Sequence, residues 1–290
     1  MAAVIVYGAA NIADGHTADM KLDSMKLSAF DPTALRAIIE GTIEAGDFEK
    51  FREFYFKTGR IEEVFLASPG GSLVEAMKIG RFVRQLKLAT MIPSRVNKEL
   101  HDLILRETNI KQSNLMCASA CFFVFVGGVT RIADDPILGI HRPFLPEKDL
   151  KTMTGDQAIE AGTLTRAIVE NYLKEMDVPI KYGEQMFAIA KDKIKWISRD
   201  EFEADFDGHI PELRDWLEAK CNNFTDIEKL AWKSLKERYP SSRTPSEEKL
   251  HNILSKKLDE QLICRLKTLR ELRIQAYTDV LSSYYKDIRR

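Results

Sequence analysis

The sequence predicts an α/β fold followed by an all-helical C-terminal region. As far as about residue 210, short apolar strands alternate with amphipathic helices, which is typical of α/β proteins whose strands pair mostly in parallel. Beyond Pro211 only helical spacing remains. The chain has 290 residues, of which 44% are hydrophobic and 30% are charged, so it can form one large core plus an appendage.

In the first half of the α/β region, short apolar runs predict strands and amphipathic spacing predicts helices. The predicted elements are strand 35–43, a helix from about 48, strand 61–68, helix 73–86 and strand 88–93. The polar segment at about 94–114 also has a helical core, and it stands where a short loop would be enough. Because this insertion leads directly into the next motif, it could act as a lid or a substrate-selecting wall.

The second half of the region begins with the stretch CASACFFVFVGG at residues 117–128. We predict a buried helix that starts at Ser119, a turn at 134–136 and then an apolar strand that ends at His141. The remaining predicted elements are helix 155–177, helix 182–191 and strand 194–198. We therefore divide the chain into an N-terminal segment 1–34, an α/β domain 35–210 with the insertion at about 94–114, and a helical extension 211–290.

Two capping boxes mark helix starts in the extension, one formed by Thr225 and Glu228 and the other by Thr244 and Glu247. The second opens a run with apolar residues at positions 250, 254, 258, 262, 266, 269 and 272. This spacing predicts a long amphipathic helix that can continue past residue 280. The extension could pack as a hairpin on its own domain, cover an oligomer face or dock a partner protein.

The charge of the chain does not favour a nucleic-acid or membrane partner, since the formal net charge is −1. Residues 225–290 carry 15 Lys and Arg against 10 Asp and Glu, and a solvated helical face explains this mild excess. No apolar run reaches the roughly 18–20 residues that span a bilayer. The apolar start MAAVIVYGAANIA lacks the basic residues of a signal peptide, and we interpret it as a first strand or a trimmed leader.

The four cysteines are too few for the disulfide framework of a small secreted domain. They stand at positions 117, 121, 221 and 264. No C-x-x-C pair occurs, and none of the five histidines lies at zinc-ligand spacing from Cys117 and Cys121. We therefore expect neither a metal site nor a cofactor.

Three local patterns could carry chemistry, although each also has a structural explanation. The turn SPGGS at 68–72 leads from a strand into a helix and could hold an oxyanion on its glycine N–H groups, or be an ordinary turn. Ser119 could be a nucleophile assisted by the N–H of Ala120, or a helix cap. His141, at a strand end, could accept a serine proton near neutral pH, or be a structural histidine.

The order and spacing of these motifs resemble the Clp protease proteolytic subunit, a family of the wider Clp/crotonase superfamily. The resemblance runs from about Leu35 to Gly208, roughly 60% of the chain. The segment EGTIEAGDFEKF resembles the strand–turn–helix opening of the family, and ASPGGSLVEAMKIGRFVR resembles its glycine loop and following helix. ASACFFVFVGGVTR and LGIHRP resemble its nucleophile helix and histidine strand. The fuller phrase CASAC…GG..R…G.HR is closer still to Clp-like proteins often predicted to be periplasmic.

The resemblance implies a fold of repeated β-β-α units, often built into rings or stacked oligomers. It implies Ser119 as the nucleophile, His141 as the base, and the N–H groups of Gly71 and Ala120 as the oxyanion donors. In a periplasmic setting Cys117 and Cys121 could pair, because helical i and i+4 positions lie about 6 Å apart. In a reducing cytosol they would be small buried thiols.

For the third triad member, the family pattern has an Asp after a long helix and before a short strand, which points to Asp192 in FAIAKDKIKWIS. Because two more residues than expected separate Asp192 from Ser198, Asp200 is the second candidate. A Ser–His dyad without a carboxylate stays open. So does a Ser–Lys dyad with Lys191 or Lys193, which would leave His141 idle.

We expect a serine hydrolase, foremost a peptidase, that acts on a peptide or protein substrate through an acyl-enzyme. One alternative is a catalytically inactive Clp-like scaffold whose helical extension binds another protein, and a further alternative is a crotonase-type acyl-CoA enzyme. We expect a homo-oligomer, and any unfoldase must be a separate chain because no G-x-x-x-x-G-K-S/T loop occurs. For the chain as given we favour the cytoplasm, with the periplasm as the alternative.

Overall fold

The computed structural model describes residues 26–29, 36–59, 61–95, 114–145, 147–238 and 242–288. The strand proposed at the start of the chain and most of the insertion, residues 96–113, lie outside the described residues. The chain divides into two compact units. The first contains the described residues up to Ile210 together with those from Ala276 onward, and the second contains Pro211–Gln275. The last part of the predicted extension therefore belongs to the first unit.

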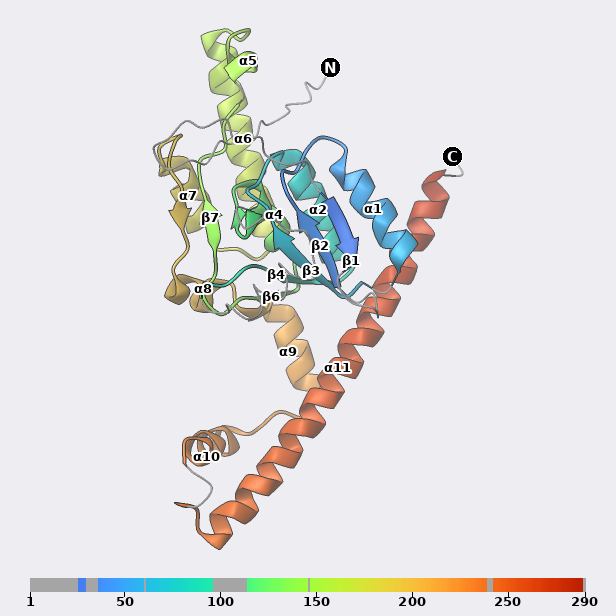
Figure 1. The fold of residues 1–290 in the computed structure, drawn as a ribbon, viewed down its shortest axis with the longest axis vertical. Helices are drawn as coiled ribbons and strands as arrows, with labels where there is room; N and C mark the ends of the chain where they lie inside the picture. The colour runs from blue at the N-terminus through green and yellow to red at the C-terminus, as the bar shows by residue number, and fades with distance from the viewer. Residues whose placement is uncertain are drawn as a thin grey trace. The chain divides into compact units, whose positions relative to one another are not determined.

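The first unit is an α/β structure with two sheets (Figure 1). The larger sheet has the order β1-β2-β3-β4-β6-β9. Its strands are β1 (Lys26–Ala29), β2 (Arg36–Glu40), β3 (Glu63–Ala67), β4 (Ala89–Met91), β6 (Thr130–Ile132) and β9 (Gly208–His209). The pairs from β2 to β6 are parallel, whereas β1 and β9 pair antiparallel at the two edges. The strands β1, β6 and β9 were not predicted.

The smaller sheet carries the functional motifs. It has the order β5-β7-β8, with β5 (Cys117–Ala118) parallel to β7 (Leu138–Ile140) and β8 (Lys195–Trp196) antiparallel to β7. An isolated bridge between Ser68 and Cys117 joins the end of the β3 segment to this sheet. The three segments that hold the glycine turn, the serine and the histidine therefore run side by side.

The helices of the first unit follow the predicted order with two short additions, α5 and α8. They are α1 (Asp47–Thr58), α2 (Leu73–Gln85), α4 (Ala120–Phe125), α5 (Glu147–Leu150), α6 (Gly155–Glu175), α7 (Lys181–Ala188) and α8 (Arg199–Asp205). On one face of the larger sheet, Ile39 and Leu66 belong to a core that includes α1, α2 and α4. On the other face, Ile38 and Phe65 pack around Leu115. Burial on both faces explains why these parallel strands are apolar along their whole length.

The second unit is helical. It consists of α9 (Pro211–Lys220), α10 (Asp226–Lys236) and the first part of α11 (Pro245–Ile288), and Thr225 forms its expected capping box with Glu228. A disulfide between Cys221 and Cys264 joins the end of α9 to α11. The rings of Trp232 and His251 stack at 5.2 Å between centroids.

The last turns of α11 pack on α1 in the first unit. The ring of Tyr284 stacks on Phe56 with 4.7 Å between centroids, and the Arg52 guanidinium lies 4.8 Å from the centre of the Tyr284 ring. Tyr277 lies 6.0 Å from Tyr55. Among the described residues, no helix combines the length and the apolar content needed to cross a membrane.

Candidate active site

Ser119 stands at a sharp turn between β5 and α4. Its backbone has φ 58° and ψ −123°, a region that residues with a Cβ rarely adopt. The Ser119 N–H donates to the Gly139 carbonyl at 3.0 Å, which fixes the turn to β7. The hydroxyl makes no capping bond to α4. Ser119 is therefore the N-cap residue of α4 by position only, and its hydroxyl is available for another partner.

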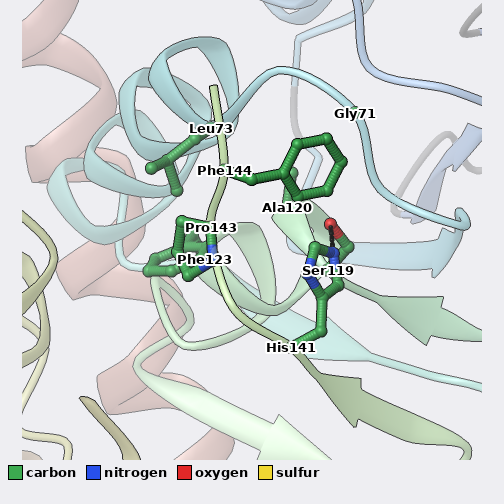
Figure 2. Close-up of a pocket in the computed structure, with 8 residues that line it drawn as sticks. All are labelled: Gly71, Leu73, Ser119, Ala120, Phe123, His141, Pro143 and Phe144. Carbon is green, nitrogen blue, oxygen red and sulfur yellow. Dashed lines mark hydrogen bonds between the residues drawn. The ribbon is translucent and has the colours of Figure 1, made fainter. Parts of the chain in front are cut away.

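That partner is His141. The Oγ of Ser119 lies 2.5 Å from Nε2 of His141, and this bond is drawn as the dashed line in Figure 2. Nδ1 of the ring lies 2.8 Å from the backbone carbonyl oxygen of Arg142. Since a carbonyl can only accept, Nδ1 carries the proton and donates it, and Nε2 of the neutral ring is left to accept the serine O–H. The tautomer is therefore the one that a general base needs.

The environment of His141 favours the neutral ring. The residue is 8% exposed, and this burial lowers the pKa of the imidazole below its ordinary value of 6.5. The hydrogen bond to the Arg142 carbonyl acts in the opposite direction, because it stabilises the protonated ring, but burial is the larger effect. The ring is therefore ready to accept a proton at neutral pH.

The carboxylate expected behind His141 is not there. Asp192 is exposed, and its nearest cation is Lys193, with 3.6 Å between Nζ and Oδ2. A turn in which the Lys193 N–H donates to the Ala190 carbonyl carries this segment into solvent. Asp200 is also exposed, in the first turn of α8. The structure therefore brings neither Asp192 nor Asp200 to the His141 ring, whose Nδ1 bonds to the Arg142 carbonyl instead.

The Ser–Lys alternative also fails on the geometry. Nζ of Lys191 lies 5.4 Å from the centre of the Phe144 ring, and Lys193 is beside Asp192. Neither lysine bonds to Ser119, whose hydroxyl is held by His141. Among the described residues, Ser119 and His141 form a dyad in which the Arg142 main-chain carbonyl stands where a triad has its carboxylate.

The glycine turn approaches Ser119 more closely than any other residue type would allow. A Cβ on Gly70 would stand 2.5 Å from Cβ and 2.8 Å from Oγ of Ser119. Gly71 has φ 134°, and a Cβ there would collide with the backbone of Ile43. The Gly70 carbonyl accepts from the Ile43 N–H at 2.8 Å, and the Ser72 N–H donates to the Ile43 carbonyl at 2.7 Å. These two bonds fix the turn on both sides of Gly71.

Two N–H groups beside the serine are left without an acceptor among the described residues. One belongs to Gly71, because the bonds of the turn use only its neighbours. The other belongs to Ala120, the first residue of α4, where the helix offers no carbonyl to bond it. Both residues line one pocket with Ser119 and His141 (Figure 2). Two such donors beside a nucleophile can stabilise an oxyanion.

The pocket itself is small and largely apolar. Its other lining residues are Leu73, Phe123, Pro143 and Phe144, which the sequence did not single out. The cavity is about 20 Å³, room for about one water molecule. The ring of Phe144 lies 5.9 Å from that of His141 and contributes to its burial. A small acyl group or a carbonyl oxygen could therefore enter, but a larger one would need the wall to move.

All four cysteines are paired, including Cys117 and Cys121, whose pairing the sequence left open. Besides Cys221–Cys264, a disulfide joins Cys117 to Cys121, with 5.2 Å between the two Cα atoms. The geometry assumed for this second pair was wrong, because Cys117 lies in β5 and Cys121 in α4, and the two are not one turn apart on a helix. The sharp turn at Ser119 brings them together.

The chain was compared with protein-family models, with curated protein sequences and with solved structures, and none of them matches it. The resemblance noted in the sequence therefore rests on the quoted motifs alone. The geometry around Ser119 has to carry the functional argument.

Proposed function

We propose that this protein is a serine hydrolase, foremost a peptidase, with the Clp/crotonase type of fold. The single observation that supports this most is the contact of 2.5 Å between Oγ of Ser119 and Nε2 of a neutral His141. A serine hydroxyl that served only packing would not need this partner, a lowered histidine pKa and two unused N–H groups beside it.

The order of the elements supports the fold part of the proposal. Among the described residues, a strand of the larger sheet precedes a strand of the smaller sheet and then a helix, first as β4-β5-α4 and again as β6-β7-α6, with the short α5 before α6. This order supports the repeated β-β-α unit that the resemblance implies. In each of these units the smaller-sheet strand ends one residue before a residue of the dyad, β5 before Ser119 and β7 before His141.

In the proposed reaction, Nε2 of His141 accepts the Ser119 proton while Oγ attacks the carbonyl carbon of a peptide bond. The electron pair of the C=O bond moves to oxygen, and the N–H groups of Gly71 and Ala120 stabilise this charge. The imidazolium then gives its proton to the leaving amine, and the acyl-enzyme forms. Water, deprotonated by the same ring, hydrolyses the ester and restores Ser119.

The Arg142 carbonyl orients the ring in each of these steps, because it accepts the hydrogen bond from Nδ1–H in both protonation states of the ring. It carries only a partial negative charge, so it stabilises the imidazolium less than a carboxylate would. We therefore expect a slower enzyme than one with a complete triad. The same observation favours one rival, a Clp-like scaffold that no longer catalyses.

A fluorophosphonate probe separates the two. In an active hydrolase the probe labels the wild-type chain, and Ser119→Ala abolishes the labelling because no nucleophile remains. His141→Ala should slow it by about 10³-fold or more, since the serine then has no base. Mass spectrometry of the labelled peptide checks the site. Ser282→Ala, in an exposed part of α11, is the matched control and should label like the wild type. A wild-type chain that stays unlabelled would favour the scaffold.

A homo-oligomer is also part of the proposal. Along α6, Ile159, Leu164 and Ile168 are exposed by 70%, 50% and 39%, which is unusual for three large apolar side chains on one helix. Their burial against a second copy of the chain would remove this apolar surface from water.

The disulfides further support an oxidising compartment, where such bonds persist, over the cytoplasm that we favoured from the sequence.

A further inference from the structure

The disulfide between Cys117 and Cys121 closes a five-residue ring of chain, and Ser119 is the middle residue of that ring. Cys117 is in β5 and Cys121 is in the first turn of α4, so the bond joins a strand to a helix across the turn. Both cysteines are fully buried. The bond is thus part of the core beneath the serine and is not placed for easy exchange with solvent thiols.

Ser119, in the turn that this ring encloses, has an unfavourable backbone conformation. A residue with a Cβ at φ 58° and ψ −123° persists only where the surroundings fix it. If Ser119 relaxed to a negative φ, its Cα–Cβ bond would point in another direction. Oγ would then leave Nε2 of His141, and the hydrogen bond of 2.5 Å would be lost.

The helix that follows cannot fix the turn by itself. α4 has only six residues, too few to be stable without tertiary contacts. Its C-terminal end has such contacts, since the Val126 carbonyl accepts from Arg131 at 2.7 Å and from Arg84 at 3.2 Å. The Phe123 carbonyl accepts from the Tyr172 hydroxyl at 2.6 Å. The N-terminal end, beside the serine, has no capping side chain.

Single main-chain hydrogen bonds are the other constraints on the turn. The Ala118 N–H donates to the Ser68 carbonyl at 3.1 Å, and the Ser119 N–H donates to Gly139 at 3.0 Å. Both lie on the strand side of Ser119. On the helix side the Ala120 N–H has no acceptor among the described residues, and one main-chain bond remains, from the Phe122 N–H to the Ser119 carbonyl at 3.1 Å. The disulfide adds a covalent constraint on this side, where that single hydrogen bond holds the turn.

We propose that the Cys117–Cys121 disulfide is a positioning device for the nucleophile, which holds Ser119 in its left-handed conformation with Oγ aligned on His141 and the Ala120 N–H directed at the pocket. The proposal rests on the proposed hydrolase function. In this proposal the disulfide acts on the geometry of the dyad and does not contact a substrate.

The test compares the rate of fluorophosphonate labelling in the wild type and in Cys117→Ala/Cys121→Ala. A displacement of about 1 Å between reacting groups can reduce a rate about 100-fold, so we expect a loss of that order with the protein still folded by circular dichroism. Cys221→Ala/Cys264→Ala removes the same atoms from the second unit and should keep the wild-type rate. An unchanged rate in the first variant would overturn the proposal and leave the hydrolase function standing.

Two further measurements separate positioning from general support of the core. Cys117→Val/Cys121→Ala refills part of the lost volume and should be as slow as the double alanine variant, since volume is not what is missing. Adding His141→Ala should slow the wild type strongly and the disulfide-free variants much less, because their dyad is already misaligned. If His141→Ala has the same effect in both backgrounds, the disulfide does not act through the dyad.

Crystal structures of the wild type and Cys117→Ala/Cys121→Ala decide the question even if neither is labelled. The proposal expects Ser119 of the variant to leave the positive φ region and Oγ to lie beyond hydrogen-bond distance from Nε2. A variant that keeps φ near 58° and the bond to His141 would overturn the proposal, whatever the activity of the wild type. Failure of the hydrolase function alone would appear instead as absent labelling of a wild type with an intact dyad.

Discussion

The two disulfides of this chain occupy contrasting surroundings. Cys117–Cys121 joins residues four positions apart, is fully buried and encloses the candidate nucleophile. Cys221–Cys264 joins residues 43 positions apart and ties two helices of a unit that has little core of its own, formed by a few residues such as Leu217, Leu235 and Leu254. The same chemical bond can therefore serve the precision of a site in one unit and the stability of a fold in the other.

Loop-closure entropy gives this comparison a magnitude. In the chain-entropy account, a cross-link stabilises the folded state by restricting the unfolded chain, and the effect grows with the length of the closed loop. The long loop closed by Cys221–Cys264 corresponds to about 4 kcal/mol, and the short loop closed by Cys117–Cys121 to about 2 kcal/mol. The bond nearer to the chemistry is thus the one expected to contribute less to stability.

The largest expected effect is a loss of stability in the second unit. Cys221→Ala/Cys264→Ala should lower the free energy of unfolding of that unit by about 4 kcal/mol. Urea titration followed by the fluorescence of Trp216 and Trp232 reports on it, since both tryptophans lie in this unit. The loss for Cys117→Ala/Cys121→Ala, measured on the first unit through Trp196, should be about half as large, plus the cost of the cavity. If, after the cost of the cavity is subtracted, Cys117→Ala/Cys121→Ala lost more free energy of unfolding than Cys221→Ala/Cys264→Ala, the comparison would be reversed.

The next effect concerns catalysis and should be confined to the first unit. Gly71→Ala adds a Cβ that collides with the backbone of Ile43 at a φ of 134°, so the turn must shift and carry its N–H away from the oxyanion. We expect turnover or labelling to fall about 100-fold, equivalent to about 3 kcal/mol in the barrier, as for other lost oxyanion donors. Gly162→Ala is the matched control, because a Cβ there would meet nothing within 4 Å. Near-normal turnover of a folded Gly71→Ala would remove Gly71 from the oxyanion site.

The smallest effect is on pH dependence. Burial holds the pKa of His141 below 6.5, and only the neutral ring can accept the serine proton. Labelling should therefore rise with pH and reach half of its plateau below pH 6.5. The Cys221→Ala/Cys264→Ala variant should give the same profile, whereas a midpoint above 6.5 in the wild type would mean that the ring is not buried as described.

The same lowered pKa has a consequence for stability. In the unfolded chain the ring takes a proton near pH 6.5, whereas in the folded state it resists protonation until the pH is lower. The unfolded state therefore binds more protons between these two values, and the first unit should lose stability as the pH falls from about 6.5. His141→Ala should show less of this loss over the same pH interval.

Sequence reasoning was effective where the signal was local. Ser119 and His141 could be found because each stands where an apolar segment meets a turn, and their spacing matches a known pattern. The strands β7 and β8 lie within predicted strands, but the two-residue strands β5 and β9 are too short to show a period, so the sequence did not reveal how either sheet is completed. Cys221 and Cys264 are far apart in the sequence, and no local property of either indicates the partner.

The position of Asp192 could not be predicted for a different reason. The resemblance points to the segment between α7 and β8, but a single turn decides whether a side chain there points inward or into solvent. The turn from Ala190 to Lys193 directs Asp192 outward. The backbone carbonyl of Arg142 that replaces it has no sequence signature, because every residue has such a carbonyl.

The use of a main-chain carbonyl to orient His141 has an evolutionary consequence. No point mutation can delete the oxygen that orients His141, whereas in an ordinary triad one substitution at the acidic position removes it. The Arg142 side chain is exposed, so substitutions there can alter surface charge while the carbonyl that accepts from Nδ1 stays. Because no third side chain is needed, mutation at such a position cannot inactivate the site. A carboxylate could later be added to this arrangement by substitution.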